Sequence, residues 1–281
     1  MKLEPRYALG WSGMADAYIT LAAHGGMPPT QAMPKAKAAA LKAIELDPLL
    51  AEAHTSLAGV EMAYDWDCAA AEKEYSRAIE LNANYATAHH WYSHCLVIMG
   101  RFPEGIGEIQ QAHELDPLSM TINDFWALAL YYSRDYAQAV AQFRAMADLD
   151  PSARSAASYG LVDVYEQQGD YAHALEAWRN MSLSSGKAQD AAALASAYAS
   201  AGPGGYWKKR IELAQQQRST PPLDLAKLYA RQGNRDGAMA LLHRAYQERS
   251  AWLNFMGCEP AFDTLRADFR FRKLAREVGV S

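Results

Sequence analysis

Bulky and small hydrophobic positions alternate along this chain in a pattern that repeats with a period of 34 residues between Asn84 and Pro151. Two copies follow one another there, and each closes on a Leu-Asp-Pro triplet, at 115–117 and at 149–151. In each copy, bulky residues such as Tyr92 and Trp126 recur at helical spacing, and the helix that follows carries small residues, such as Gly105, Ala112 and Ala139. This arrangement predicts pairs of antiparallel α-helices, each of which must be covered by the next pair.

The pattern continues on both sides of these two copies and predicts about seven helix pairs. It is interrupted at 24–29 and at 202–205, where glycine and proline predict a longer loop and an altered turn. After the seventh pair, residues 252–262 are expected to form an irregular link and residues 268–278 a final helix. We therefore predict an all-α fold, a right-handed α-solenoid over residues 1–250, with a C-terminal capping segment and helix over 251–281.

The start of the chain matches the end of a repeat. Leu3-Glu4-Pro5 is similar to the closing triplets at 115–117 and 149–151. The sequence therefore predicts that the chain begins within a truncated helix and was taken from a longer protein.

Composition narrows the class of partner. The net charge is −5, so the broad positive field of a nucleic-acid-binding protein is not expected, and a basic or polar partner is favoured. The three cysteines, Cys68, Cys95 and Cys258, lack the paired spacing of a zinc site and are expected to be buried, reduced thiols. No apolar run approaches the ~18 residues of a membrane span, and the first residues are unlike a signal peptide. A soluble, cytoplasmic protein is expected.

The first helix pair opens with Trp11, Met14, Ala15 and Tyr18, in the spacing Trp-x2-Leu-Gly-x2-Tyr. With the copies described above, this pattern resembles the tetratricopeptide repeat (TPR) family over nearly the whole chain. Four stretches also resemble the C-terminal TPR arrays of bacterial multidomain signalling and transcription-regulator proteins: 65–67, 84–92, 248–253 and 263–266. Such arrays follow winged-helix, nucleotide-cyclase or protein-kinase domains, whose activities do not transfer to this sequence.

The resemblance implies that the first helix of each pair lines a concave groove. The groove positions are polar or acidic: Asp16, Glu52, Thr55, Thr87, His90, His94, Thr121, Asp124, Tyr131, Tyr159, Asp163 and Glu166. Among groove positions, only Lys227 in the seventh pair would neutralise these carboxylates. We therefore predict a non-catalytic scaffold that binds a basic or polar peptide, or a partner helix, without a cofactor. A solvated acidic face without a dedicated ligand is the alternative.

Two other functions stay open. His90 and His94 lie four residues apart on one helix, so they could share a metal ion with Asp124 as a third ligand. The Glu that a zinc protease needs after the first His is missing, and we assign neither a metal nor a catalytic residue. A metal-dependent hydrolase using His90 and His94 is thus a weaker alternative to a small-molecule sensor, which would use the groove or the turn at 202–205.

Overall fold

The structure is a computed structural model that describes residues 4, 6–186, 188–217, 220–250 and 252–280. These residues form α-helices joined by turns, and no strand occurs in the ranges given. The truncated helix expected at 1–5 lies outside the described residues, except for Glu4. The helices are α1 (Ala8–Ala23), α2 (Pro29–Leu46), α3 (Ala51–Val60), α4 (Cys68–Leu81), α5 (Ala86–Ile98), α6 (Phe102–Leu115), α7 (Met120–Tyr132), α8 (Tyr136–Leu149), α9 (Arg154–Gln168), α10 (Tyr171–Ser185), α11 (Ala188–Gln216), α12 (Pro222–Gln232), α13 (Arg235–Gln247) and α14 (Phe269–Glu277).

Shorter helical turns complete the described structure. They are the π-turn η1 (Glu61–Asp65) and the 3-10 turns η2 (Pro151–Ala153), η3 (Leu253–Gly257) and η4 (Pro260–Leu265). Two of these, η3 and η4, form the link that the sequence predicts to be irregular. The predicted final helix is present as α14.

The chain forms two compact units. The first unit comprises residues 1–116, 244–258 and 273–281, and the second comprises 117–243 and 259–272. The C-terminal part of the chain therefore contributes to both units. The predicted division into a solenoid over 1–250 and a capping segment over 251–281 stays a prediction.

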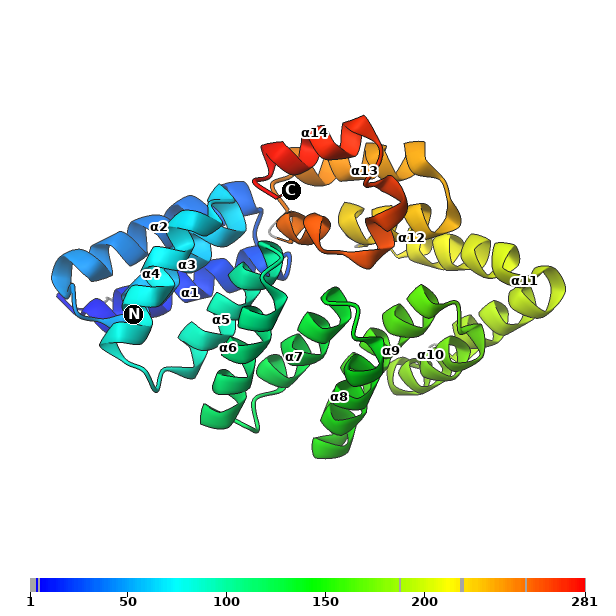
Figure 1. The fold of residues 1–281 in the computed structure, drawn as a ribbon, viewed down its shortest axis with the longest axis horizontal. Coiled ribbons are helices and arrows are strands. Elements are labelled where there is room, and N and C mark those ends of the chain that lie inside the picture. The colour runs from blue at the N-terminus through cyan, green and yellow to red at the C-terminus, as the bar shows by residue number, and fades with distance from the viewer. Residues whose placement is uncertain (1–3, 5, 187, 218–219, 251, 281) are drawn as a thin grey trace. The chain divides into compact units, whose positions relative to one another are not determined.

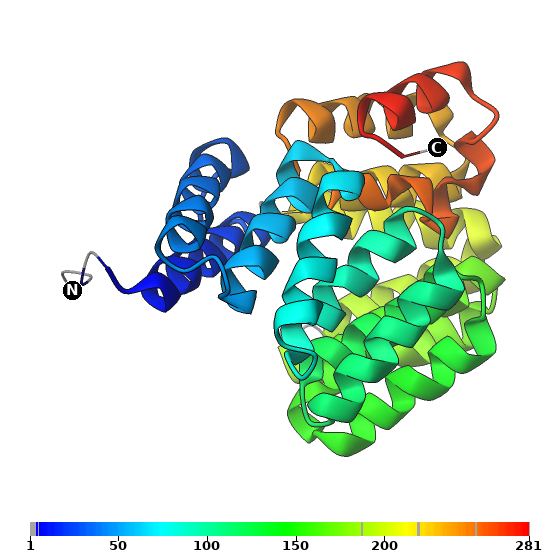
Figure 2. The ribbon, with the colours of Figure 1, turned by 60° about the vertical axis from the view of Figure 1, so that its left-hand side comes forward.

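Within the first unit, helices α1 to α6 form three helix-turn-helix pairs, and α3 to α6 lie side by side (Figures 1 and 2). Their packing uses small residues where helices meet. Ala51, Ala78 and Ala88 form a buried cluster among α3, α4 and α5, with Tyr85 packed against it. The absence of bulk at these alanines allows close helix approach, as the repeat pattern predicts.

The turn between α3 and α4 departs from the regular repeat. The π-turn η1 ends at Trp66, which has a left-handed backbone with φ of 60° and a buried ring. The Asp67 side chain then accepts a hydrogen bond from the backbone N–H of Ala70 and caps the start of α4. Arg249 stacks over Trp66, with its guanidinium carbon 4.2 Å from the ring centroid, and donates a hydrogen bond to the Tyr64 carbonyl.

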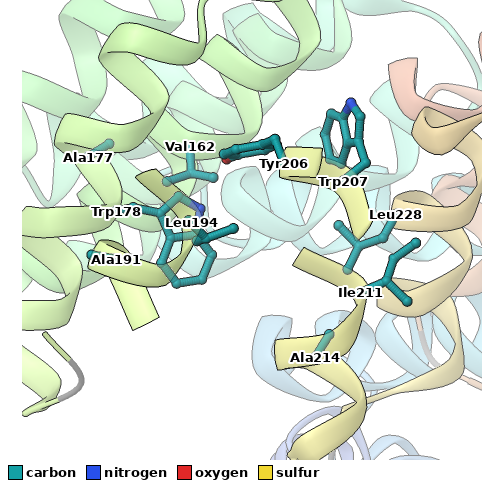
Figure 3. Packing of buried hydrophobic residues seen from close by; sticks show 10 residues of the cluster. All are labelled: Val162, Ala177, Trp178, Ala191, Leu194, Tyr206, Trp207, Ile211, Ala214 and Leu228. Atoms are coloured by element: carbon teal, nitrogen blue, oxygen red, sulfur yellow. The ribbon is translucent and has the colours of Figure 1, made fainter. Parts of the chain in front are cut away.

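The second unit contains the pairs α7/α8 and α9/α10, the two halves of α11, and α12 with most of α13. The long helix α11 is broken at Ala201 and Gly202, and Gly202 has φ of 59°, so the turn lies where the sequence predicts it. Figure 3 shows the hydrophobic cluster that joins α9 to α12, in which Trp178 lies beside Leu194 and Ile211 faces Leu228.

The predicted all-α solenoid of about seven helix pairs is confirmed. Each pair occurs at its predicted place, including the irregular first and sixth pairs. Cys68, Cys95 and Cys258 are buried free thiols, as the sequence predicts. Within the described ranges, no helix combines the length and the apolar composition that a bilayer crossing requires.

Candidate functional site

The twelve residues predicted to line one groove divide equally between the two units. The first unit holds Asp16, Glu52, Thr55, Thr87, His90 and His94, and the second holds Thr121, Asp124, Tyr131, Tyr159, Asp163 and Glu166. We therefore describe the two sets separately.

His90 and His94 are buried in the first unit and contact each other. Their Nε2 atoms lie 3.2 Å apart, which fits a hydrogen bond in which one ring donates to the other. Burial lowers the pKa of His90 to about 4 and that of His94 well below its ordinary value, and the His90 ring adds to the second shift. Both rings are thus neutral near pH 7. Below about pH 6.5 the unfolded chain binds more protons at these histidines than the folded protein does. The free energy of unfolding therefore falls as the pH falls below that value.

The C-terminal part of the chain packs against His94. The rings of Trp252 and Phe255 lie 6.1 and 6.0 Å from the His94 ring, centroid to centroid. Asn254 between them donates a hydrogen bond to the Met62 carbonyl. His94 therefore packs against a segment of its own chain. Among the described residues, no group of three or more His, Cys, Asp or Glu side chains is placed to hold a metal ion.

The other predicted residues of the first unit lie on α1, α3 and α5. The Ser56 hydroxyl donates to Asp16 over 2.6 Å, and burial raises the pKa of Asp16 to about 6 against the effect of that bond. Thr55 is buried and donates to the Ala51 carbonyl within its own helix. Glu52 and Thr87 are partly exposed. Asp16 thus belongs to a contact between α1 and α3.

In the second unit, Glu166 is the centre of a buried charge network. Its side chain has no exposed surface. Its Oε1 atom accepts hydrogen bonds from the Tyr206 hydroxyl at 2.6 Å and from Arg210 Nε at 2.8 Å, and its Oε2 atom accepts one from Arg231 at 2.9 Å. Two guanidinium groups from α11 and α12 therefore neutralise one carboxylate of α9.

Arg231 extends this network to other predicted groove residues. One terminal nitrogen donates to Asp163 over 2.8 Å, and the other donates to the Tyr131 hydroxyl over 2.9 Å. Burial alone would raise the pKa of Asp163, but Arg231 and Lys227 hold it below its ordinary value. The expectation that these carboxylates lack basic partners is therefore wrong for Asp163 and Glu166. Arg210 and Arg231 do not occupy groove positions, which were the positions considered in that expectation.

A cavity of about 340 Å³ lies against this network, and we call it the second-unit cavity. Its walls are residues of α9 to α12 and the turn before α12: Ser155, Tyr159, Asp163, Trp178, Met181, Ser182, Asp190, Arg210, Leu213, Ala214, Gln217, Thr220, Pro221, Asp224, Lys227, Leu228 and Arg231. Part of the wall is apolar, and charged groups converge on the rest. Two of the predicted residues, Tyr159 and Asp163, are among them, and Glu166 lies behind Arg210 and Arg231.

The charged groups of the cavity differ in how well they are paired. Lys227 Nζ lies 3.8 Å from Asp224 and 3.5 Å from Glu259, which is long for a hydrogen bond. Burial raises the pKa of Asp224, although Lys227 opposes this shift. Within the described residues, the carboxylates of Asp224 and Asp190 accept no hydrogen bond. The cavity therefore contains two carboxylates that a ligand can approach.

A second cavity, of about 510 Å³, lies between α8, α9 and α10. Its walls include Arg144, Asp148, Arg154 and His173. None of the predicted groove residues lines it. It provides a comparison for experiments on the second-unit cavity.

Thr121 and Asp124 lie on α7, and Thr121 is exposed. Burial raises the pKa of Asp124 to about 6, above the ~3.9 of an unfolded chain. The folded protein thus binds more protons between about pH 4 and 6, and its free energy of unfolding falls as the pH rises through that window.

Asp124→Asn is expected to remove this pH dependence, because asparagine cannot ionise. At pH 7 the variant should be more stable than the wild type by up to about 3 kcal/mol, and the difference should vanish near pH 4. Urea denaturation at both pH values measures it. Asp236→Asn, which changes an exposed carboxylate, is the control and should retain the wild-type profile. Parallel profiles for Asp124→Asn and the wild type would contradict the assignment.

The repeat pattern assigns no binding role to Arg210, Arg231, Trp178 or Glu259. One signal was available, because Arg231 follows Lys227 by four residues and therefore shares its helix face. Arg210 lies in the second half of α11, and Glu259 lies in the irregular link, so neither occupies a first-helix position. Their roles depend on contacts that the repeat pattern does not encode.

No family model matches the sequence. Among solved structures, the chain is similar to PilF of Pseudomonas aeruginosa, with 18% identity over 95% of this chain and 99% of that chain and a TM-score of 0.50. It is similar to PilW, a type IV pilus biogenesis factor, with 14% identity over 65% and 80% of the two chains and a TM-score of 0.54. A thermophilic TPR protein of Thermus thermophilus is 14% identical over 64% and 94%, with a TM-score of 0.52. At these identities the likeness shows the fold, which is that of a TPR solenoid.

Proposed function

We propose that this protein is a non-catalytic interaction scaffold that binds a peptide or a partner helix at the second-unit cavity. The observation that carries the proposal is the cavity itself, where charged groups converge beside an apolar wall. Two of its walls are α9 and α12, the first helices of their pairs, which are the helices that the TPR resemblance assigns to ligand binding. In the first unit, Glu52 and Thr87 are partly exposed and remain candidates for a separate contact.

The charges of the cavity favour a basic ligand. Arg210 and Arg231 already pair with Glu166 and Asp163. Among the described residues, Asp190 and Asp224 accept no hydrogen bond, and Asp224 has only the long ion pair with Lys227. A lysine or arginine side chain would supply the donors. The Tyr159 ring, 49% exposed, offers a face for the same cation.

The polar groups also suit the backbone of a peptide. The Nε1 atom of Trp178 is buried, and within the described residues it has no hydrogen-bond acceptor. A buried donor without an acceptor is unfavourable, so a ligand carbonyl that reached it would relieve that cost. This feature supports a peptide over a simple cation.

A small-molecule sensor is the second candidate, because the cavity volume lies within the range of small-molecule sites. The place of the array in a larger bacterial regulatory protein is a proposal that rests on the sequence resemblance alone. Cytoplasmic localisation likewise stays a prediction.

The proposal can be tested with pools of fluorescein-labelled nonapeptides that share a fixed central residue. Pools with arginine or lysine at the centre are expected to bind with roughly micromolar affinity, and pools with glutamate or norleucine should bind more weakly. The double variant Asp190→Asn/Asp224→Asn should weaken binding of the arginine pool about tenfold or more, because both acceptors lose their charge. Fluorescence anisotropy measures the affinities.

Asp148→Asn is the matched control, since it changes a carboxylate of the other cavity. It should bind the arginine pool as the wild type does. Equal binding of the four pools, or equal loss in both variants, would refute the basic-peptide proposal. Preference for free argininamide over every peptide pool would favour the small-molecule candidate.

A further inference from the structure

Residues Glu259–Arg272 of the second unit, which we call the C-terminal segment, dock beside the second-unit cavity. Glu259 is 2% exposed, accepts a hydrogen bond from the Tyr131 hydroxyl at 2.7 Å, and caps η4 through the Ala261 N–H. Gln167 of α9 donates to the Pro260 carbonyl. The segment therefore contacts α7, α9 and α12, the last through close packing of η4.

Lys227 is shared between the cavity and the C-terminal segment. Its ammonium lies between Asp224, which lines the cavity, and Glu259, which belongs to the segment. Its side chain is 19% exposed, and both ion-pair distances are long. By contrast, Glu166 is fully buried and held by three donors within 2.9 Å. Lys227 is thus more loosely held than Glu166, because both of its ion pairs are longer than the contacts of Glu166.

Arg231 makes a second connection. It pairs with Asp163 in the cavity wall and donates to Tyr131, whose hydroxyl donates in turn to Glu259. Each hydrogen bond in this series is short, and all of them lie within the second unit. The cavity and the C-terminal segment are therefore connected twice, through Lys227 and through Arg231 with Tyr131.

We propose that the charge of the ligand in the second-unit cavity controls how tightly the C-terminal segment docks. This regulation rests on the proposed function. A cationic group at Asp224 competes with Lys227 for that carboxylate and directs Lys227 to Glu259, which tightens the segment. An anionic group draws Lys227 away from Glu259 and loosens the segment. The two effects have opposite signs because one ammonium serves both carboxylates.

Hydrogen exchange of the full-length chain, followed by mass spectrometry, tests the coupling without any ligand. In Asp224→Asn, Glu259 no longer competes with a second carboxylate for Lys227, and the repulsion between Asp224 and Glu259 is removed. Hydrogen exchange in the C-terminal segment should therefore slow by about fivefold. Glu259→Gln keeps an acceptor for Tyr131 and for the Ala261 N–H but loses the charge. In that background, Asp224→Asn should have no effect on exchange in the segment.

The ligand arm uses Nα-acetylargininamide and Nα-acetylglutamate as probes. The first should slow exchange in the segment and the second should speed it, and Glu259→Gln should abolish both responses. Exchange in α8, which lies in the second unit and does not line the second-unit cavity, serves as the control for folding. Binding of the arginine probe, seen as chemical-shift changes at Tyr159, without a change in the segment would overturn the coupling and leave the proposed function intact. Absence of probe binding would count against both the proposed function and the coupling. If Asp224→Asn still slowed exchange in the Glu259→Gln background, the coupling alone would be overturned.

Discussion

Glu166→Ala is expected to destabilise the second unit by about 3–5 kcal/mol, because it leaves two buried guanidinium groups without their shared carboxylate. Arg210 and Arg231 have 10% and 5% exposed side chains, so water cannot replace Glu166 without opening the packing. Tyr206, which is fully buried, also loses its acceptor. The free energy of unfolding is measured by urea denaturation. Hydrogen exchange in α9 and α11 then shows whether the loss lies in the second unit.

Two further variants define the cause. Glu166→Gln retains the shape and one acceptor oxygen but removes the charge, so its cost should be smaller than that of alanine. Glu212→Gln removes a carboxylate of α11 that is 41% exposed and pairs with Lys209, and it should leave the unfolding midpoint unchanged. An unchanged midpoint for Glu166→Ala would mean that the arginines are solvated and that the network is not buried.

The sequence predicts the helices well because the repeat is local. Each helix pair is defined by contacts between neighbouring positions, and the turn at Gly202 is marked by residues that cannot continue a helix. The network around Glu166 is different in kind. Arg210 and Arg231 lie 44 and 65 residues away in the chain, and Tyr131 and Glu259 are 128 residues apart. A pattern with a 34-residue period contains no information on such pairs.

The same limit applies to the predicted groove. The resemblance assigns groove positions from the first helices alone, and three of these positions, Tyr159, Asp163 and Lys227, line one cavity. It takes no account of the irregular link, whose Trp252 and Phe255 cover His94 and whose Glu259 binds Tyr131. An irregular segment has no periodicity from which its contacts can be inferred. The surroundings of His94 and Tyr131, which contact this link, could therefore not be predicted from the sequence.

Phe143→Ala should cost the second unit about 3–5 kcal/mol, because the fully buried ring fills the contact between α8 and α9. The ring packs directly over Gly160, where an added Cβ would lie 2.2 Å from the nearest ring carbon. Gly160→Ala alone is therefore expected to destabilise by about 1–3 kcal/mol through overpacking, despite the gain in helix propensity. Urea denaturation of the single variants measures both costs.

The double variant Phe143→Ala/Gly160→Ala separates close packing from other causes. Removing the ring leaves room for the new methyl group, so Gly160→Ala should then be neutral or stabilising by up to about 1 kcal/mol, the difference in helix propensity. The two substitutions would thus be strongly non-additive. Gly107→Ala on α6, where an added Cβ meets no atom within 4 Å, is the control and should stabilise in either background. Additive costs at positions 143 and 160 would contradict the direct contact and would require that α8 and α9 pack in another register.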